Sequence, residues 1–261
     1  MFQRKLLLLK IRPAFRPALL LSQALRPRCQ MRTYPIKGAH GELVHTLGVR
    51  VVSGDIEPME ILNVDQIGLE FGVSRTVVRE ALKVLAGKGL VESVKKLGTY
   101  ATTESAWNWL DPDVIRWTFE NSPNYSLLDD LGEVRLILEP IATKLAASRR
   151  TEEDISDLGD AILEMAQAAR EESLDPELFT RSDLTFHSAI YKSTKNQFLL
   201  SFSIVMQTGL LIRDQLVHTS ANVRSDAVKK HRQVFEAIVA REPEVAEARM
   251  RELLVDAAAD A

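Results

Sequence analysis

The sequence predicts a mainly α-helical protein, in which an N-terminal winged helix-turn-helix domain is followed by an all-α antiparallel helical bundle. Two observations predict this fold class. Between residues 38 and 104, three segments with the apolar spacing of helices precede one segment in which apolar and polar residues alternate. After Pro123, every segment has helical periodicity, and no strand signal of comparable strength occurs.

Two helices are predicted at the beginning of the first domain. Residues 43–53 have apolar side chains at helical spacing, namely Leu43, Val44, Leu47 and Val51. Gly54 ends this helix. Asn63 and Gln66 are three residues apart ahead of Ile67, and this capping-box pattern predicts a short helix over 64–71.

A third helix and a hairpin complete the first domain. Gly72 makes the turn, and Ser74 is a good N-cap for a helix that ends near Ala86. Residues 90–103 alternate apolar and polar side chains on either side of Lys95-Lys96-Leu97-Gly98, which predicts a two-stranded hairpin with a basic tip. Helix, helix, turn, helix and hairpin is the order of a winged helix-turn-helix.

The second half of the chain is predicted to be helical throughout. A linker rich in tryptophan comes first, and we expect its three indoles to form an interdomain apolar contact rather than a ligand cage: Trp107, Trp109 and Trp117. Six helices then follow, at 125–149, 151–172, 176–194, 196–217, 223–240 and 243–259. The predicted organisation is an extension over 1–37, a winged domain over 38–104, a linker over 105–122 and an all-helical domain over 123–261.

Composition is consistent with this organisation. The chain has 261 residues, of which 46% are hydrophobic and 26% are charged, and its formal net charge is −3. The single cysteine, Cys29, excludes an intrachain disulfide and a cysteine-rich metal cluster, and favours a reducing, cytoplasmic location. No run approaches the roughly 18 uninterrupted apolar residues of a membrane span, so we expect no membrane partner.

The extension over residues 1–37 contains nine Lys or Arg and no acidic residue. Its first 30 residues are rich in Arg and Leu, a composition that imitates an organellar transit peptide. A basic DNA-contacting arm is a second interpretation. We favour a third, in which translation starts at Met31 and the preceding segment is not part of the fold.

The third helix separates cationic from aliphatic side chains. Arg75, Arg79 and Lys83 are four residues apart, and the aliphatic side chains project from the opposite side: Val77, Val78, Ala81, Val84 and Leu85. The DNA major groove accepts one α-helix, and an arginine fork can reach the O6 and N7 acceptors of guanine there. Ser74 and Thr76 can hold phosphate oxygens at the positive end of the helix.

Local charge favours DNA binding over the alternative of a solvated surface helix. Between Val73 and Tyr100 there are six basic residues and two acidic ones, which supplies attraction to phosphate. Lys95 and Lys96 at the hairpin tip suit contact with the backbone or the minor groove. The turn, the caps, the hairpin and this charge together favour an interface with double-stranded DNA.

These residues resemble a known family. The segment FGVSRTVVREALKVLAGKGLVES…LGTY is similar to the DNA-binding domain of the GntR family of bacterial regulators, and the helical remainder resembles the FCD ligand domain of its FadR-type branch. The likeness covers about residues 40–258. It implies base or phosphate contacts by five residues at the beginning of the third helix, namely Ser74, Arg75, Thr76, Val77 and Arg79. It also places Gly98 at the wing tip. The second helix departs from the family, because Asp65 stands where a basic or polar contact residue is common.

A candidate metal site is predicted in the bundle. Asp183 and His187 are four residues apart and point the same way from one helix, and His231 lies on a later helix that can return antiparallel. A carboxylate and two imidazoles suit zinc, nickel or manganese. The alternative is ordinary packing and hydrogen bonding. The resemblance implies that the three match the family's metal ligands and that Leu253 occupies the slot of a common fourth ligand, a histidine.

Arg135 is the main candidate for binding an effector. It matches the family's Arg-x-x-x-Glu pattern, and it could hold an effector carboxylate or pair with Glu139 one turn later. Arg213 could act similarly. The linker WNWLDPDVIRW is similar to that of galactonate-operon repressors, which favours a sugar acid as the effector.

The sequence therefore predicts a homodimeric, sequence-specific transcriptional regulator rather than an enzyme. We expect a repressor of a galactonate-like catabolic operon that binds an inverted-repeat operator and is released by a carboxylate effector. One alternative is a metal-dependent enzyme acting on a small carboxylic acid. Another is an activator that responds to a different organic acid.

Overall fold

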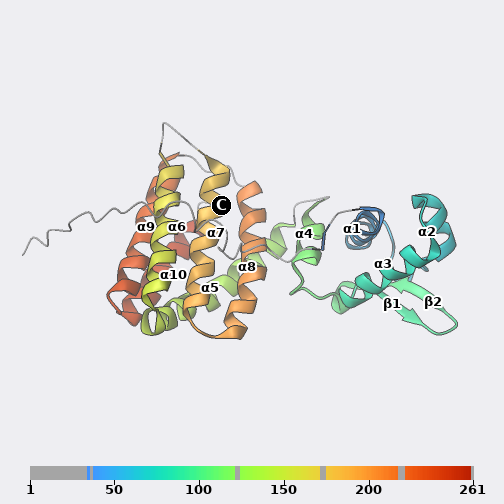
Figure 1. Ribbon diagram of the computed structural model, residues 1–261, viewed down its shortest axis with the longest axis horizontal. Coiled ribbons are helices and arrows are strands. Elements are labelled where there is room, and N and C mark those ends of the chain that lie inside the picture. Colours follow the sequence, from blue (N-terminus) through green and yellow to red (C-terminus); the bar gives the residue numbers. More distant parts are fainter. Residues whose placement is uncertain (1–33, 36–37, 121–123, 171–174, 217–220, 260–261) are drawn as a thin grey trace, which may run out of the picture. The chain divides into compact units, whose positions relative to one another are not determined.

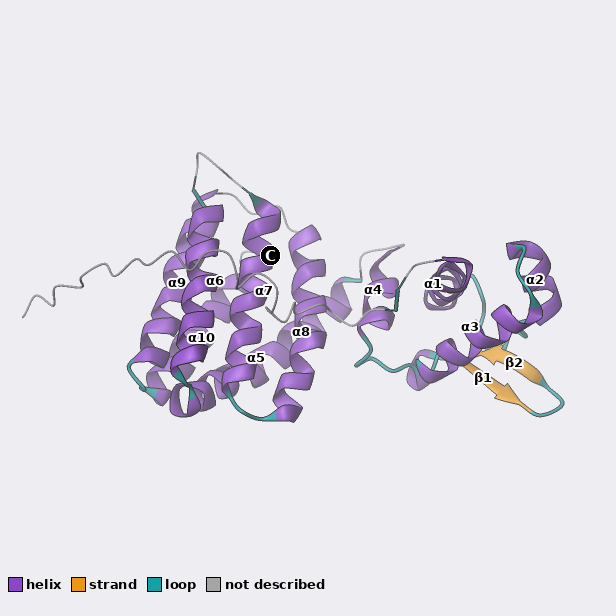
Figure 2. Cartoon of the chain, in the orientation of Figure 1, coloured by secondary structure: helices purple, strands orange, loops and turns teal. Residues whose placement is uncertain are grey.

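The computed structural model describes residues 34–35, 38–120, 124–170, 175–216 and 221–259 (Figure 1). The predicted extension, apart from Tyr34 and Pro35, lies outside these residues, so its interpretation stays a prediction. The described part contains ten α-helices and one β-hairpin (Figure 2). Nine of these helices and the hairpin follow the predicted order, and the tenth helix lies in the predicted linker. The predicted fold class is confirmed.

The first domain consists of three helices and a hairpin. These are α1 (Gly38–Val52), α2 (Val64–Phe71), α3 (Arg75–Gly87), β1 (Val91–Val94) and β2 (Gly98–Ala101). The strands pair antiparallel, with Val91 opposite Ala101 and Val94 opposite Gly98. Ile61, ahead of α2, forms an isolated bridge with Tyr100 and so connects the hairpin to the helix-turn-helix.

Local capping sets the turn between α2 and α3. The Asn63 side chain accepts hydrogen bonds from the backbone N–H of Asp65 at 2.9 Å and of Gln66 at 3.3 Å. Gly72 follows α2 in the left-handed region with φ 66°, where glycine is favoured because it has no Cβ. The Ser74 hydroxyl accepts from the N–H of Val77 at 3.4 Å and caps α3. Short-range hydrogen bonds and Gly72 therefore define where α2 ends and where α3 begins.

The tryptophan-rich segment forms a 3-10 helix, η1 (Glu104–Ala106), and a short α-helix, α4 (Pro112–Glu120). Trp117 is 1% exposed within the apolar core that α1 and α3 build, and Trp107 and Trp109 pack against the same core. The predicted interdomain contact is therefore wrong in detail, because all three indoles join the first domain. Two other α4 residues contact the core of the bundle: Ile115 is buried in it, and the partly buried Phe119 packs against it.

Lys88 attaches this segment to the end of α3. Its ammonium lies 2.8 Å from Asp111 Oδ2 and 2.7 Å from Asp113 Oδ2, and the residue is only 8% exposed. Asp113 also accepts from the N–H of Tyr34 at 2.8 Å and pairs with Arg116. A buried cation needs such partners, since an unpaired charge is costly to desolvate.

Six helices make up the bundle: α5 (Tyr125–Arg149), α6 (Glu152–Ala168), α7 (Pro176–Ser193), α8 (Gln197–Leu216), α9 (Ala221–Val239) and α10 (Pro243–Ala259). Apolar residues from all six form its core. Their bounds lie within four residues of the predicted ones, because Asn124, Thr151 and Asp175 cap helices where the sequence signals a start.

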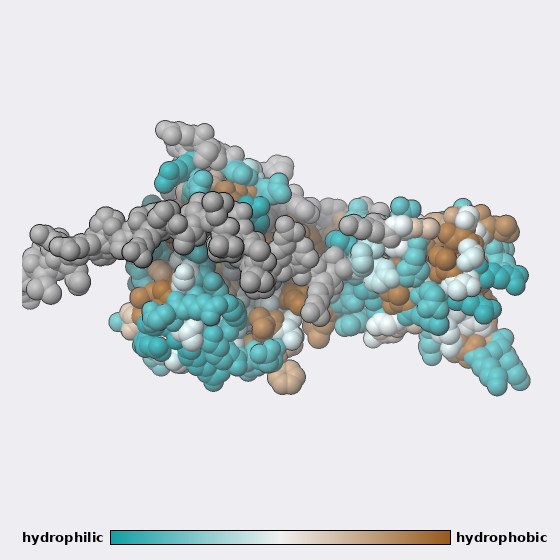
Figure 3. Space-filling view, viewed as in Figure 1, coloured by the Kyte–Doolittle hydropathy of each residue, from teal (hydrophilic) through white to brown (hydrophobic). Residues whose placement is uncertain are grey.

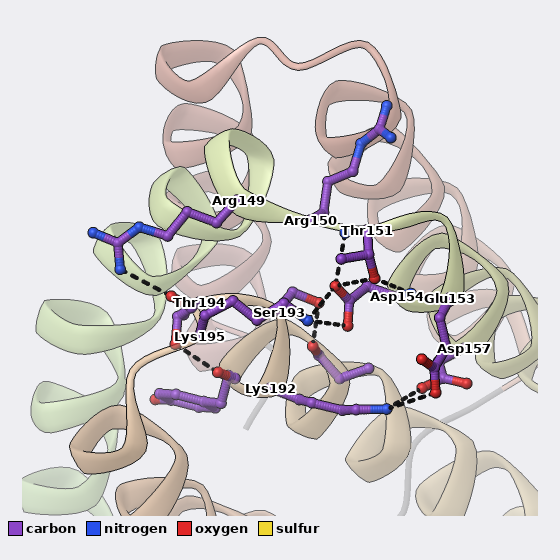
Figure 4. A network of polar contacts seen from close by, with 12 residues as sticks. Arg149, Arg150, Thr151, Glu153, Asp154, Asp157, Lys192, Ser193, Thr194 and Lys195 are labelled. Carbon is purple, nitrogen blue, oxygen red and sulfur yellow. Dashed lines mark hydrogen bonds and ion pairs between the residues drawn. The ribbon is translucent and has the colours of Figure 1, made fainter.

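A polar cluster connects α6 to the turn between α7 and α8 (Figure 4). Asp154 accepts from the backbone N–H of Thr151 at 2.8 Å and from its hydroxyl at 2.9 Å, completing a capping box. The ammonium of Lys195 lies 2.6 Å from Asp154 Oδ2, and that of Lys192 lies 2.8 Å from Asp157 Oδ2. These pairs fix the α7–α8 turn against the beginning of α6.

The surface of the described residues is mixed. Hydrophilic and hydrophobic residues are interspersed over the face shown in Figure 3. Among the described helices, none has the length and apolar character needed to cross a lipid bilayer.

Candidate nucleic-acid interface and metal centre

The two faces predicted for the third helix are present on α3. Arg75, Arg79 and Lys83 are exposed. The aliphatic side chains on the other side are at most 5% exposed, namely Val78, Ala81, Leu82 and Leu85. Val77 and Val84, also expected on the apolar face, are half-buried. The helix is therefore anchored by its aliphatic side while its cationic edge lies on the surface.

The beginning of α3 carries exposed polar groups. Ser74 and Thr76 are both exposed there. The first N–H groups of a helix lack intrahelical partners and share the positive end of the helix dipole, so this position suits a phosphate oxygen. Val77 is the one predicted contact residue on α3 that also packs against the domain core.

The three cations of α3 differ in their partners. Arg75 pairs with Asp65 of α2 through two nitrogen–oxygen contacts. The ammonium of Lys83 lies 2.8 Å from Glu80 Oε1, one turn earlier. Among the described residues, Arg79 has no carboxylate within ion-pair distance. A ligand can therefore engage Arg79 without breaking an internal ion pair.

The wing tip carries two more exposed cations. Lys95 and Lys96 lie in the turn between β1 and β2, and both are exposed. Lys96 has φ 73° and Gly98 has φ 105°, so the chain reverses through two residues in the left-handed region. The turn presents both ammonium groups at the tip of the hairpin.

A carboxylate and two imidazoles meet inside the bundle. Asp183 and His187 come from α7, and His231 comes from α9. His231 Nε2 lies 2.8 Å from Asp183 Oδ1, and His187 Nε2 lies 3.7 Å from the same oxygen. The three residues are at most 9% exposed, and one ligand atom from each lies within 4.8 Å of the others. The structure thus brings the three predicted metal ligands together.

The outer nitrogen of each histidine lies close to an oxygen. His231 Nδ1 lies 2.7 Å from the carbonyl of Ala227, and His187 Nδ1 lies 2.7 Å from Glu139 Oε2. When Nδ1 carries the proton, the Nε2 lone pair points to the shared centre, as in metal-binding histidines. The two Nε2 atoms are 3.4 Å apart. Two tetrahedral ligands about 2.1 Å from an ion have a similar separation, so these residues fit a divalent transition ion.

The acids around this centre are held as anions. Burial raises the pKa of Asp183, but His187 and His231 lower it further, and the net shift is downward. Burial also raises the pKa of Glu139, yet Arg135 and His187 bring it down to about 2. Both carboxylates are therefore available as ligands or acceptors near neutral pH.

Arg135 and Tyr191 lie beside this centre. Arg135 Nε donates to Glu139 Oε1 at 2.8 Å, so the pairing that the sequence left open is present, and both residues are buried. Tyr191 is 1% exposed, and its hydroxyl has no hydrogen-bond partner among the described residues. Its pKa is raised, first by burial and then by Glu139, so the hydroxyl stays protonated as a donor.

Sequence reasoning missed Tyr191 although one signal for it exists. It follows His187 by four residues and so continues the row that Asp183 begins on α7.

The two other predictions in the bundle have different outcomes. Arg213 lies in α8, at a position whose side chain is outside the described part. Leu253 is 4% exposed and packs in the apolar core of the bundle.

A winged helix-turn-helix with an exposed cationic helix, followed by a helical bundle that encloses a polar centre, is the architecture of a DNA-binding transcriptional regulator. Residues 40–101 match the family model described as bacterial regulatory proteins, gntR family, and residues 130–256 match that of the FCD domain. The chain belongs to the GntR family.

Individual relatives agree with this assignment. The chain is 34% identical to the HTH-type transcriptional regulator YieP of Escherichia coli K12 over 76% of this chain and 84% of the relative. It is 29% identical to the galactonate operon transcriptional repressor of the same organism, over 78% and 89%. A solved structure of Lar from Listeria monocytogenes superimposes with a TM-score of 0.60 at 19% identity, over 87% of this chain and 97% of that one. These relatives are regulators, not enzymes.

Proposed function

We propose that this regulator is a homodimeric repressor of a sugar-acid catabolic operon and that a carboxylate effector releases it from an inverted-repeat operator. The buried centre of Asp183, His187 and His231 supports the ligand-binding part of this proposal, because convergent titratable groups inside an apolar bundle are typical of a functional site. The similarity to the galactonate operon transcriptional repressor supports a sugar acid as that partner.

In this proposal α3 enters the major groove and the wing contacts the flanking backbone. Arg75 and Arg79 reach base edges, while Lys83, Lys95 and Lys96 neutralise phosphates. Ser74 and Thr76 hold a phosphate at the beginning of the helix, and Val77 and Gly98 allow close approach to the duplex. The exposure of every cation in this set supports the assignment.

A substitution at Arg79 tests the base contact. If Arg79 reads a guanine, Arg79→Ala weakens binding to the cognate site by about 1–3 kcal/mol and flattens the preference at one base pair. Equal losses on all duplexes would assign Arg79 to phosphate contact instead.

The effector is proposed to bind in the bundle beside Arg135. Asp183, His187 and His231 would hold a zinc, nickel or manganese ion, which supplies a positive charge with positions open to a ligand's oxygens. Arg135 would add N–H donors for the carboxylate, and Tyr191 would donate to a hydroxyl or carboxylate oxygen. Arg213 is retained as a second candidate for the carboxylate. Binding weakens DNA affinity only when the effector prefers the arrangement that binds DNA poorly.

A histidine at position 253 tests the metal assignment. Leu253→His introduces a histidine at the position where the family commonly has its fourth metal ligand. The variant should therefore lose its metal to a chelator more slowly than the wild type does. Leu254→His is the matched control, because it introduces the same side chain one residue later at a similarly buried position. Metal content after timed chelation is the measurement. Wild-type protein without bound metal after loading would contradict the assignment.

The decisive test is a gel-shift titration on the DNA upstream of the protein's own coding sequence. We expect binding that exceeds binding to a scrambled duplex and that one member of a panel of sugar acids releases. A chelator should abolish the release if the ion takes part in effector binding. Binding that is equal on both duplexes would contradict sequence-specific regulation. Release by amino acids or fatty acids alone would redirect the effector class.

A further inference from the structure

The first cation of α3 is already engaged inside the protein. Arg75 Nη2 donates a hydrogen bond to Asp65 Oδ2 at 2.8 Å, and Arg75 Nε contacts Asp65 Oδ1. The two side chains are 72% and 54% exposed, so this two-point pair lies on the surface that the proposed DNA interface uses. The pair also links the two helices of the helix-turn-helix across their turn.

Asp65 is a fixed anchor for this pair. It lies in the first turn of α2, where a carboxylate interacts favourably with the helix dipole. The Asn63 side chain accepts from the N–H of Asp65 at 2.9 Å and orders the backbone there. The carboxylate thus projects from an ordered helix start rather than from a loop.

The contact determines which part of the guanidinium is left for DNA. Asp65 engages Nε and Nη2, which form one edge of the planar group. The opposite end, formed by one N–H of Nη1 and one of Nη2, still presents two parallel donors. Two parallel donors match the O6 and N7 acceptors of guanine in the major groove.

We propose that Asp65 is a specificity-determining positioning residue, which fixes Arg75 for end-on recognition of one guanine in each operator half-site. This inference rests on the proposed DNA interface. An unpaired carboxylate at this surface would repel phosphate, so Asp65 acts through Arg75 rather than by touching the backbone. Asp65 thereby restricts the conformations of the Arg75 side chain before DNA binds. It also disfavours alternative contacts of Arg75 with phosphate.

The chain offers a matched control at Glu80. Glu80 is also an exposed acid of the helix-turn-helix, but it pairs with Lys83 at 2.8 Å through a single contact. Asp65→Asn and Glu80→Gln each remove one negative charge from the same domain. A difference between the two variants therefore reports the Arg75 contact and not the general change in charge.

The experiment is to select a half-site from randomised duplexes with the wild-type protein and then to measure Kd for all four base pairs at each position. We expect a preference of about 5- to 100-fold for guanine at one position, which Arg75→Ala abolishes. Asp65→Asn should reduce that preference at least fivefold and leave the other positions unchanged. Glu80→Gln should strengthen binding to all duplexes alike and keep the preference.

Two results would overturn the inference and leave the interface intact. One is an Asp65→Asn variant that changes Kd equally for all four base pairs, as expected for Glu80→Gln. The other is a loss of preference at a position that Arg75→Ala does not affect. If Arg75→Ala itself changes neither affinity nor preference, the proposed interface at α3 is wrong as well. Thermal unfolding and circular dichroism of each variant separate these results from misfolding.

Discussion

Tyr191 supports the proposed effector site at the scale of a single residue. A buried hydroxyl that lacks a hydrogen-bond partner costs about 1–3 kcal/mol of stability. Tyr191 is 1% exposed on the same row of α7 as Asp183 and His187, and its hydroxyl has no partner among the described residues. An effector with oxygen atoms would supply that partner and recover the cost.

We therefore predict that Tyr191→Phe separates stability from effector binding. The variant should be as stable as the wild type or more stable by up to about 1 kcal/mol, because it removes an unpaired polar group. Its affinity for the effector should fall about tenfold, which corresponds to one lost hydrogen bond of about 1.4 kcal/mol. Thermal unfolding without effector and a titration with effector measure the two quantities. A less stable variant with unchanged effector affinity would make the hydroxyl structural.

At the scale of elements, the contact between α1 and α4 depends on a glycine. A Cβ atom added at Gly48 would overlap the indole ring of Trp117, which is buried against α1. Gly48→Ala should therefore destabilise the protein by about 1–3 kcal/mol, the range for overpacking in a rigid core. Gly132→Ala in α5 is the control, since no atom lies within 4 Å of the added Cβ and alanine favours a helix. Urea denaturation of both variants is the measurement, and equal effects would contradict the packing argument.

The Asp154 cluster makes the stability of the bundle depend on pH (Figure 4). Burial raises the pKa of Asp154, but Lys195 and Thr151 lower it further, so the folded-state pKa lies below the unfolded-state value of about 3.9. Stability from this group is present above the unfolded-state pKa and is lost as pH falls through the folded-state pKa.

Asp154→Asn should thus lower the free energy of unfolding at pH 7 by about 1 kcal/mol, the usual value of a helix cap. The difference from the wild type should shrink as the pH falls below about 3.9. Asp157→Asn, which removes a half-exposed ion pair with Lys192, should change stability by less than about 0.5 kcal/mol. Denaturation curves between pH 7 and pH 3 test both variants. A difference for Asp154→Asn that is constant with pH would indicate a steric effect.

The elements also show what the sequence can and cannot predict. The bounds of α2 were predicted correctly because Asn63 and Gly72 act within a few residues. Asp183 and His187 could be paired in advance because four residues make one helical turn, and their match to the family selected His231. Tyr191 could not be distinguished from a core tyrosine without knowing its partners. The Asp65–Arg75 contact and the core that contains Trp117 depend on tertiary packing. Local periodicity carries no information about such contacts.

For the whole molecule, regulation through an inverted repeat requires a two-fold symmetric dimer. One face of α5 supports such an interface. Val134, Ile137 and Ile141 are spaced along that face, and they are 37%, 66% and 46% exposed. A row of exposed aliphatic residues on one helix is unfavourably exposed to water in a monomer. A second copy of the chain can bury it. We propose that this face of α5 contributes to the dimer.

Ile137→Lys should then shift the protein from dimer to monomer, because it introduces a charge into the buried part of the interface. The monomer should bind a single half-site with the affinity of one wild-type domain. It should lose most of the extra affinity for two correctly spaced half-sites, because only a dimer holds its second domain at high effective concentration near the second half-site. Leu163→Lys is the matched control: Leu163 lies on α6 and is also 66% exposed. Light scattering and titrations on duplexes with one and two half-sites distinguish the outcomes.

If both variants remain dimers with wild-type affinity for the full operator, the interface lies elsewhere. If Ile137→Lys is a monomer that still prefers the full operator, dimerisation is not the source of that preference.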